Sequence, residues 1–344
     1  MKARSIVIGL LVSAVFLYLA FRKTDLHEIG AHLGGADHWY LLPASVLTIL
    51  AFWIRALRWG VLLHPLRPIR IGPLFSATMI GFMGNNLLPM RLGELVRAWV
   101  IARSARIRGS AALATIVVER LFDLFSVAAI FGLILLFAPF HHRPFKMGVL
   151  LALAVGAGVL GALIFFHLRG EDSSALARRF LPRALRPRVL RLLESFQSGL
   201  GIFRDRRRLA LIAGLTMLMW FCFAVVVVLC FAAARLEAGG ETLPPLASLV
   251  VLVVMAIGIM VPSGPGFVGT LQAAAVLGLA IVGYRDQNRA LSFSILYHAT
   301  QWFPVVAVGL VCLMRENLSL AQMGRLTSEA TLAEGGGPGQ GDAR

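Results

Sequence analysis

Long apolar runs dominate the sequence and restrict the folds that it can adopt. They fall at about 5–21, 40–63, 72–88, 92–102, 111–138, 146–168, 208–234, 246–261, 266–282 and 290–314. Several reach the roughly 17–25 residues that a helix needs to cross the core of a bilayer. Hydrophobic residues make up 58% of the chain and charged residues only 15%. We therefore expect an all-α polytopic membrane protein.

The net charge of +16 fits the same class of protein. In a soluble protein such an excess would suggest a nucleic-acid partner. Here most basic residues lie between apolar runs, where the positive-inside rule places them, so we expect no nucleic acid. Cys222, Cys230 and Cys312 lie inside apolar runs, without the spacing of metal ligands or of a disulfide framework. We accordingly expect no metal and no cofactor.

Two pairs of neighbouring runs are joined by turns that are unlike ordinary loops. The run at 72–88 ends in the polar pair Asn85 and Asn86, followed closely by a proline. The run at 246–261 ends in Pro-Ser-Gly-Pro-Gly, a cluster of helix breakers. Irregular backbone at membrane depth is tolerated where it is buried in protein or lines a wet cavity. We therefore predict two re-entrant helical hairpins and about six full spans.

The distribution of charge predicts the orientation of these spans. The segment 169–208 contains eleven arginines against four acidic residues, so it is predicted to be cytoplasmic. With two hairpins, the basic segments 55–72 and 103–108 fall on the same side, as do both termini. An arrangement of straight spans alone would separate 55–72 from 169–208. Apolar residues among the arginines of 169–208 favour an amphipathic helix on the anionic leaflet over a solvated linker.

The two hairpins also indicate an internal repeat. Residues 40–138 and 208–314 each contain a span, a hairpin and a span, and they enter the membrane from opposite faces. The sequences Pro-Met-Arg-Leu-Gly-Glu-Leu at 89–95 and Pro-Gly-Phe-Val-Gly-Thr-Leu at 265–271 match at the two turns. Inverted repeats with broken helices are typical of secondary transporters.

The whole repeat is predicted to form one membrane domain over 1–318. The apolar run near the start is expected to be an uncleaved first helix rather than a signal peptide, because no small-residue cleavage site follows it. The polar, glycine-rich residues 319–344 are expected to be a flexible tail.

Charged side chains in the first hairpin are costly at the centre of a bilayer, so each must pair or face a cavity. On its second arm, Arg91, Glu94 and Arg97 are spaced so that Glu94 can bridge the two guanidinium groups. This group is either a structural clamp or, together with Asn85 and Asn86, a site for an anionic head group. The second interpretation rests on the ability of arginine to bind phosphate bidentately.

A second group of charges lies in the run at 111–138. Glu119 and Asp123 are four residues apart and share a helix face, with Arg120 beside them. They form either a closed internal salt bridge or part of the same binding site. Arg55 and Arg58 lie near the end of a span, and we expect them to snorkel to its cytoplasmic edge.

The second hairpin offers hydrogen-bonding groups instead of charges. The glycines of its turn, Gly264 and Gly266, would let the backbone approach a ligand closely. A lone buried histidine in the last run is either a packing residue or a proton carrier. The polar side chains expected near this turn are Ser263, Thr270, Gln272, Tyr297, His298 and Gln301.

Four motifs, in order, resemble the lysylphosphatidylglycerol synthase transmembrane (flippase-like) family. They are Asn-Leu-Leu-Pro-Met-Arg-Leu-Gly-Glu-Leu-Val-Arg at 86–97, Glu-Arg-Leu-Phe-Asp at 119–123, Pro-Ser-Gly-Pro-Gly-Phe-Val-Gly-Thr-Leu-Gln at 262–272 and Leu-Tyr-His at 296–298. The resemblance runs from about 5 to 315. It implies a membrane domain without the synthase domain that some members possess. Gln272 departs from the family, in which an acidic residue is common, so no charge-coupled role is expected there.

The resemblance implies a lipid flippase of the bacterial inner membrane that moves a phospholipid or lipid-linked substrate between leaflets. Its partners would be membrane lipids with an anionic or modified head group and a lipid-synthesis or glycosyltransferase protein; a homo-oligomer stays open. Two other functions also stay open. One is an integral-membrane glycosyl- or lipid-modifying transferase, with Glu94, Glu119, Asp123 or His298 as the base. The other is an accessory subunit of a hopanoid or glycolipid biosynthesis system.

Overall fold

The computed structural model describes residues 3–22, 24–88, 92–137, 205–238, 241–261, 263–320 and 322. The run at 146–168 and nearly all of the segment 169–208 lie outside the described residues. The same is true of Arg91 at the first turn and of most of the tail at 319–344. The predictions made for these parts of the chain therefore stay predictions.

The described apolar runs form helices close to the predicted bounds. In chain order the elements are α1 (Ala3–Phe21), α2 (Leu26–Gly34), η1 (His38–Tyr40), α3 (Leu41–Leu63), α4 (Ile71–Leu87), α5 (Gly93–Ala105), α6 (Gly109–Phe137), α10 (Arg206–Ala233), β1 (Glu237–Ala238), β2 (Glu241–Thr242), α11 (Pro245–Gly258), η4 (Pro265–Phe267), α12 (Thr270–Ile281) and α13 (Gln287–Arg315). The short antiparallel pair β1–β2 is a small departure from the all-α prediction. It pairs backbone groups in the polar connection between two helices, where no helical hydrogen bonds are available.

One helix was not expected from the apolar pattern. Helix α2 has nine residues and lies between the first two long runs. Asp25 caps it, because its carboxylate accepts a hydrogen bond of 2.7 Å from the backbone N–H of His27. Asn288 at the start of α13 donates to Glu28 on this helix, so α2 is attached to the far end of the chain.

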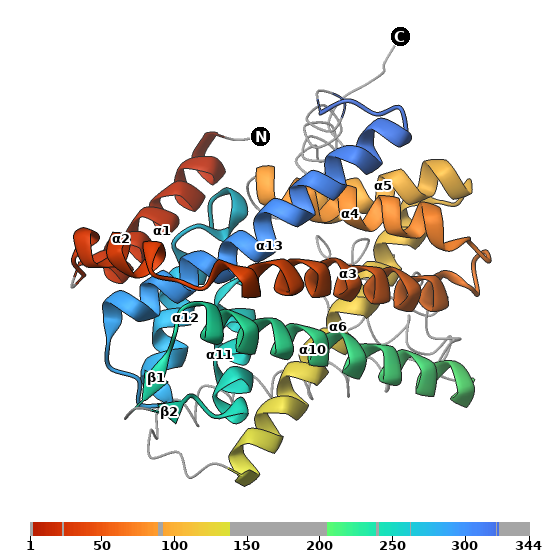
Figure 1. Ribbon diagram of the computed structural model, residues 1–344. Helices are drawn as coiled ribbons and strands as arrows, with labels where there is room; N and C mark the ends of the chain where they lie inside the picture. Colours follow the sequence, from red (N-terminus) through yellow and green to blue (C-terminus); the bar gives the residue numbers. More distant parts are fainter. Residues whose placement is uncertain are drawn as a thin grey trace, which may run out of the picture.

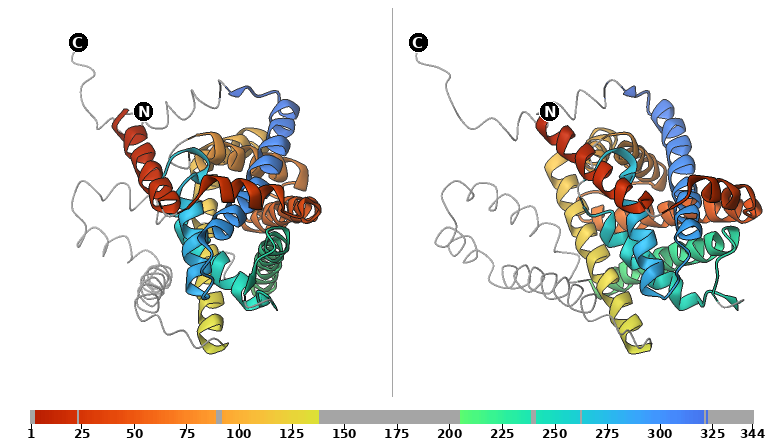
Figure 2. Two further views of the ribbon diagram at one scale, coloured as in Figure 1. Left: turned by 60° about the vertical axis from the view of Figure 1, so that its left-hand side comes forward. Right: turned by 90° about the vertical axis from the view of Figure 1, so that its left-hand side faces the viewer.

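Two long helices, α3 and α10, lie side by side and antiparallel (Figures 1 and 2). The residue before η1, Asp37, donates its backbone N–H to the carbonyl of Ala233 at 2.9 Å, which joins the start of α3 to the end of α10. Helix α13 crosses this pair, and α6 runs diagonally behind it (Figure 1). The short helices α4 and α5 form one antiparallel hairpin, and α11 and α12 form another.

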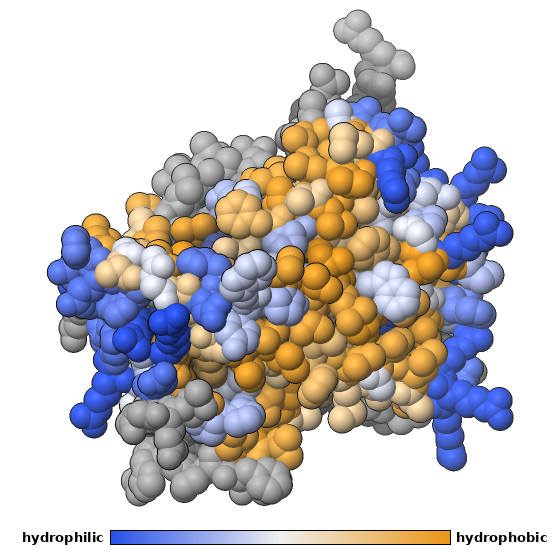
Figure 3. Space-filling model, in the orientation of Figure 1, coloured by the Kyte–Doolittle hydropathy of each residue, from blue (hydrophilic) through white to orange (hydrophobic). Residues whose placement is uncertain are grey.

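An apolar belt crosses the middle of one face of the molecule. Figure 3 shows hydrophobic side chains across the centre of one face, with hydrophilic ones gathered at the left and right ends. On α3 the exposed residues Leu42, Val46, Leu50 and Trp53 follow a helical spacing and so form one outward stripe. Within the described residues, three helical segments are long and apolar enough to cross a membrane: His38–Leu63, Arg206–Ala233 and Gln287–Arg315. Together with this belt, they make the chain a membrane protein.

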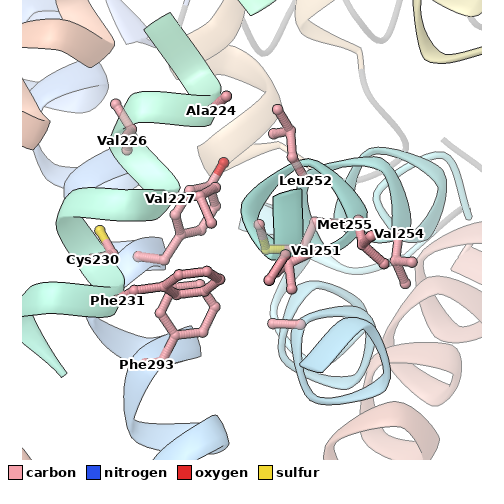
Figure 4. Close-up of a cluster of buried hydrophobic side chains, with 14 of the residues drawn as sticks. Ala224, Val226, Val227, Cys230, Phe231, Val251, Leu252, Val254, Met255 and Phe293 are labelled. Atoms are coloured by element: carbon pink, nitrogen blue, oxygen red, sulfur yellow. The ribbon is translucent and has the colours of Figure 1, made fainter. Parts of the chain in front are cut away.

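The core between α10, α11 and α13 is packed with aliphatic and aromatic side chains (Figure 4). Phe231 on α10 and Phe293 on α13 stack with ring centroids 5.0 Å apart and planes tilted by 55°. Val251 and Met255 on α11 are buried in the same cluster. This core fixes the second hairpin against the long helices and so determines where its turn lies.

Candidate functional site

Charged side chains from three helices meet in the interior. We call the following set the charged cluster: Arg55 and Arg58 on α3, Glu94 and Arg97 on α5, and Glu119, Arg120 and Asp123 on α6. Glu119 and Arg58 have no exposed surface, and Arg97 is 1% exposed. Buried charges of this kind persist only when they are paired, so the cluster determines how these helices pack.

Matched helical spacings build the centre of the cluster. Arg55 and Arg58 are three residues apart on α3, and Glu119 and Asp123 are four apart on α6, so each pair presents one face to the other helix. Arg55 Nη1 donates to Glu119 Oε1 at 2.8 Å and to Asp123 Oδ2 at 2.9 Å. Arg58 Nη2 lies 2.7 Å from Asp123 Oδ1. The sequence predicted a closed ion pair within α6, and Arg120 Nη1 lies 3.3 Å from Asp123 Oδ2. The contacts from α3 are additional to that pair.

The expectation that Arg55 and Arg58 snorkel to a membrane edge is wrong. Their side chains are 7% and 0% exposed. They can be buried because α6 places two carboxylates opposite them, and the resulting ion pairs offset the cost of removing the charges from water. They are the site residues that reasoning from single segments missed. The available signal was that two arginines lie three residues apart on one predicted helix and two acids lie four residues apart on another, so that each pair shares a helix face.

Arg97 contacts both oxygens of Glu119, one through a hydrogen bond and the other as an ion pair. Its Nη1 donates to Oε1 at 3.0 Å, and its Nη2 lies 3.0 Å from Oε2. The guanidinium also lies 3.9 Å from the ring centroid of Trp59, a cation–π contact that fixes its plane. Arg97 is therefore paired within the protein, and its partner is Glu119 rather than Glu94.

Glu94 pairs with Arg120 rather than with Arg97. Its Oε1 lies 3.1 Å from Arg120 Nε. The predicted contact between Glu94 and Arg97 is wrong, because the guanidinium group of Arg97 pairs with the carboxylate of Glu119 on α6. Arg91 lies outside the described residues. The Glu94 and Arg120 side chains are 26% and 30% exposed, so this pair is the most open part of the cluster.

The second hairpin holds a separate hydrogen-bonded network. The backbone N–H of Gly269 donates to Gln272 Oε1 at 2.7 Å, which caps the start of α12. Because this bond fixes the amide, Gln272 Nε2 faces His298 Nδ1 at 2.9 Å. The Nδ1 atom must then accept, which places the ring proton on Nε2. Thr270 donates to Phe267 O at 3.0 Å and lies 3.3 Å from the hydroxyl of Ser263.

The glycines of the second turn serve close packing within the protein. Gly266 has a φ of +69°, and a Cβ there would lie 3.2 Å from Trp302 Nε1 and 3.3 Å from the carbonyl oxygen of Asn86. Gly269, the glycine of the matched motif at this turn, has a φ of +91° and packs against the backbone of Ser13. Gly264 has a φ of −64° and so does not need the left-handed freedom of glycine; its N–H donates to Ser13 Oγ at 2.8 Å.

A cavity of about 160 Å³ lies between the charged cluster and the second hairpin. One wall is charged or amidic, and the other is aromatic and aliphatic. It is lined by Phe52, Arg55, Phe82, Asn85, Asn86, Glu94, Arg120, Trp220, Phe223, Leu252, Met255, Ala256, Ile259, Phe267, Leu271, Tyr297, His298, Gln301, Trp302 and Val305.

Residues of both predicted groups therefore meet in one place. Of the predicted site residues, Asn85, Asn86, Glu94, Arg120, Tyr297 and His298 line the cavity. Arg97, Glu119 and Asp123 lie behind its charged wall, whereas Ser263, Gly264, Gly266, Thr270 and Gln272 shape the neighbouring turn. The described residues contain no group of three or more His, Cys, Asp or Glu side chains that could hold a metal ion.

Comparison with known proteins gives a consistent picture over most of the chain. The sequence profile of the family described as "Lysylphosphatidylglycerol synthase TM region" matches residues 6–309. Glycosyltransferase AglD of Haloferax volcanii is 26% identical over 344 residues, which cover 92% of this chain and 55% of that protein. The chain thus spans about half the length of this curated relative. A UPF0104 membrane protein of Methanothermobacter thermautotrophicus is 28% identical over 281 residues, covering 75% of this chain and 78% of that one.

Proposed function

The chain belongs to the family of the lysylphosphatidylglycerol synthase transmembrane region, and we propose that it moves a phospholipid or lipid-linked substrate between the leaflets of the bacterial inner membrane. The observation that carries this proposal is the cavity between the charged cluster and the second hairpin. Its charged and amidic wall suits a polar head group, and its aromatic and aliphatic wall suits the adjoining apolar part of a lipid. The cavity residues Phe52 and Gln301 lie near the middle of α3 and α13, so the site is at mid-depth of the molecule.

The lengths of the hairpin helices support a re-entrant arrangement. At about 1.5 Å per residue, the 17 residues of α4 and 13 of α5 extend roughly 25 and 20 Å, and the 14 of α11 and 12 of α12 extend roughly 21 and 18 Å. Each is shorter than the roughly 30 Å core of a bilayer. The outer ends of the first hairpin lie together, since Arg67 Nη1 donates to Ala105 O at 2.7 Å. Both arms would therefore open on the cytoplasmic side.

Contacts between the halves support an inverted repeat. Helices α3 and α10 are antiparallel, so hairpins that follow their ends enter from opposite sides. The two turns approach one another where Gly266 packs against the carbonyl of Asn86. The matched motif glycines, Gly93 and Gly269, both lie at a close approach: a Cβ on Gly93 would collide with Gly81 O, and one on Gly269 would lie 2.5 Å from Ser13 O.

Rocking of one repeat against the other would expose the central cavity to each leaflet in turn. The moving contact would be the one between the two hairpin turns, because each turn is attached to its own half. Gln272 at the second turn pairs with His298 on α13, and α5 ties the first turn to α6 through the charged cluster. A head group could then cross inside the cavity while its acyl chains stay in lipid.

The test is movement of a fluorescent phospholipid across vesicles that contain the purified protein, with a quencher added outside. Ala256 lines the cavity, and Ala256→Trp should fill it and stop the movement. The matched control is Ala213→Trp, which places the same side chain on an exposed position of α10 and should leave movement unchanged. Equal movement by both variants, with both inserted and folded, would refute transport through this cavity.

A transferase is a second candidate, because the relative from Haloferax volcanii is named a glycosyltransferase. The described site offers limited support for it. Glu94, Glu119 and Asp123 each contact a guanidinium group, and His298 Nδ1 is occupied by Gln272, so the candidate bases are already engaged. Incubation of the same vesicles with radiolabelled donor lipid would decide the question. A labelled covalent product would favour transfer, and copurification with a synthase would favour an accessory role.

A further inference from the structure

The described residues form two large hydrophobic cores, one around each hairpin. The second-hairpin core includes Val251 on α11 and Leu279 on α12, and the first-hairpin core includes Ile80 on α4 and Ile101 on α5. Within the described part of the chain, neither core contains a residue of the other hairpin. Each hairpin is therefore packed as a separate unit, and a motion that changes the space between them must involve the helices that pass through both cores.

Helix α13 passes from one core to the other (Figure 1). Its buried residues in the second-hairpin core are Ala290, Phe293, Leu296 and Tyr297, and those in the first-hairpin core are Val305, Cys312 and Leu313. The boundary between the two sets thus falls between positions 297 and 305. A proline, Pro304, lies at this boundary.

Other contacts of α13 divide at the same place. Before the proline, His298 Nδ1 lies 2.9 Å from Gln272 Nε2 on the second hairpin. After it, Gly309 packs closely on the first hairpin, since a Cβ there would lie 2.5 Å from the Cβ of Met83 and 3.0 Å from the carbonyl oxygen of Met79. The two parts of α13 are therefore attached to different hairpins.

The proline weakens α13 at the point where these attachments change. Proline has no backbone N–H, so the carbonyl of Thr300, four residues earlier, has no N–H at position 304 to accept from. The ring also crowds that carbonyl, and prolines are the commonest cause of sharp helix kinks. Among the described helices of more than 20 residues, α13 is the one with a proline beyond its first turn. It already lacks the backbone bond that would resist bending there.

We propose that α13 is hinged at Pro304 and that bending at this hinge tilts the two hairpin cores relative to one another. This inference rests on the proposed function, because it names the joint that the rocking motion would use. The hinge lies at the wall of the central cavity. Tyr297, His298, Gln301 and Trp302 line the cavity before the proline, and Val305 lines it after the proline. A bend between these residues changes the width of the cavity.

The hinge is tested by a distance between spin labels on its two sides, in the full chain in phospholipid vesicles after replacement of Cys222, Cys230 and Cys312. The labelled positions are Leu277→Cys on α12 and Met314→Cys in the last turn of α13, which are 55% and 67% exposed. From position 304 to position 314 the helix extends roughly 15 Å, so a bend of about 20° moves the second label by about 5 Å. Double electron–electron resonance resolves such a change.

The unchanged protein should give two distances or one broad distribution. Pro304→Ala supplies the missing N–H and stiffens the helix, so it should give one narrow distribution. Pro304→Gly supplies the same N–H but keeps the backbone flexible, so it should stay broad. In the lipid-movement assay, Pro304→Ala should slow movement at least about tenfold, and Pro304→Gly should slow it less. Pro304→Ala should also raise the denaturant midpoint of unfolding, because alanine suits a helix interior.

The matched control is Pro73→Ala, which removes a proline from the first turn of α4, where backbone N–H groups have no helical partner. It should leave the distance distribution unchanged. The inference is overturned by a Pro304→Ala distribution equal to that of the unchanged protein, by equal narrowing in Pro304→Gly, or by narrowing without slower lipid movement. An unchanged protein that moves no lipid, but whose distribution narrows in Pro304→Ala, would refute the proposed function and leave the hinge in place.

Discussion

Arg55 and Glu119 are 64 residues apart in the chain, and Arg55 Nη1 donates a buried hydrogen bond of 2.8 Å to Glu119 Oε1. The same carboxylate also binds Arg97 and lies 3.5 Å from Arg58. One side chain on α6 thereby connects two other helices. They are α3, the long helix before the first hairpin, and α5, the second arm of that hairpin. Glu119 is therefore the residue on which the packing of the first half depends most.

We predict that Glu119→Gln lowers the free energy of unfolding by about 3–5 kcal/mol, because it leaves buried guanidinium groups without their counter-ion. Reversible unfolding of the detergent-solubilised protein by a denaturing detergent would measure it. Glu237→Gln is the control, since Glu237 is exposed on β1 and should change stability by less than about 0.5 kcal/mol. Similar losses in the two variants would show that the cluster does not hold the helices together.

Arg97→Lys should also destabilise the protein, by about 1–3 kcal/mol, although it keeps the charge. A lysine cannot bind both oxygens of Glu119, and it loses the planar contact with Trp59. Arg103→Lys on the same helix is the matched control, because Arg103 lies over Trp99 at an exposed position. If both variants unfolded alike, the bidentate contact would have no energetic role.

The sequence predicted most of this architecture for an identifiable physical reason. Apolar runs and the breakers between them determine where helices begin and end, and the bounds of α3 and α13 agree closely with the runs at 40–63 and 290–314. The partners of the charged residues could not be read from single runs. Glu94 was predicted to pair with arginines close to it in the sequence, but α6 packs against α5 and brings Arg120 to it. The packing of α6 against α3 likewise buries Arg55 and Arg58.

The glycines show a similar limit. A turn that contains several glycines does not reveal which of them needs a positive φ, because that depends on the path of the chain through its surroundings. Gly266 was identified and has a φ of +69°. Gly264 was identified and has ordinary backbone angles, whereas Gly269 was identified only as a glycine of the matched motif and has a φ of +91°. The partner of Gly269 is α1, more than 250 residues earlier in the chain, and no local pattern contains that information.

Single cysteines introduced after replacement of Cys222, Cys230 and Cys312 should report the predicted topology. His64→Cys and Ser104→Cys lie at exposed positions that follow α3 and end α5, and both should be labelled from the cytoplasmic side. Glu237→Cys and Arg285→Cys flank the second hairpin and should be labelled from the opposite side. An impermeant maleimide applied to oriented vesicles makes the measurement. Labelling of all four positions from one face would contradict the two-hairpin arrangement.

Gly266→Ala and Gly283→Ala separate backbone strain from contact between the two turns. Both residues have a positive φ, so each alanine should cost about 1–2 kcal/mol in unfolding free energy. A Cβ on Gly283 meets nothing within 4 Å, whereas one on Gly266 presses on Trp302 and Asn86. Gly266→Ala should therefore lose more stability and should slow lipid movement, whereas Gly283→Ala should not slow it. Equal behaviour would mean that the turns do not depend on close contact.

The last prediction concerns the pairing of Gln272 with His298. Gln272→Glu keeps an acceptor for the Gly269 N–H, but its second oxygen faces the lone pair of His298 Nδ1. The pair regains a hydrogen bond when the folded protein binds a proton there. Because the folded state then binds more protons than the unfolded state, the variant's stability should rise as the pH falls from about 8 to about 5.5.

At the higher pH we expect Gln272→Glu to lose about 1–3 kcal/mol relative to the unchanged protein, measured by denaturing-detergent titration at each pH. Gln272→Leu is the comparison, because it removes the cap of α12 and the contact with His298 at every pH. Its loss should therefore not recover on acidification. A Gln272→Glu variant whose stability does not change relative to the unchanged protein, or falls on acidification, would show that Nδ1 is not the accepting atom and would reverse the tautomer assigned to His298.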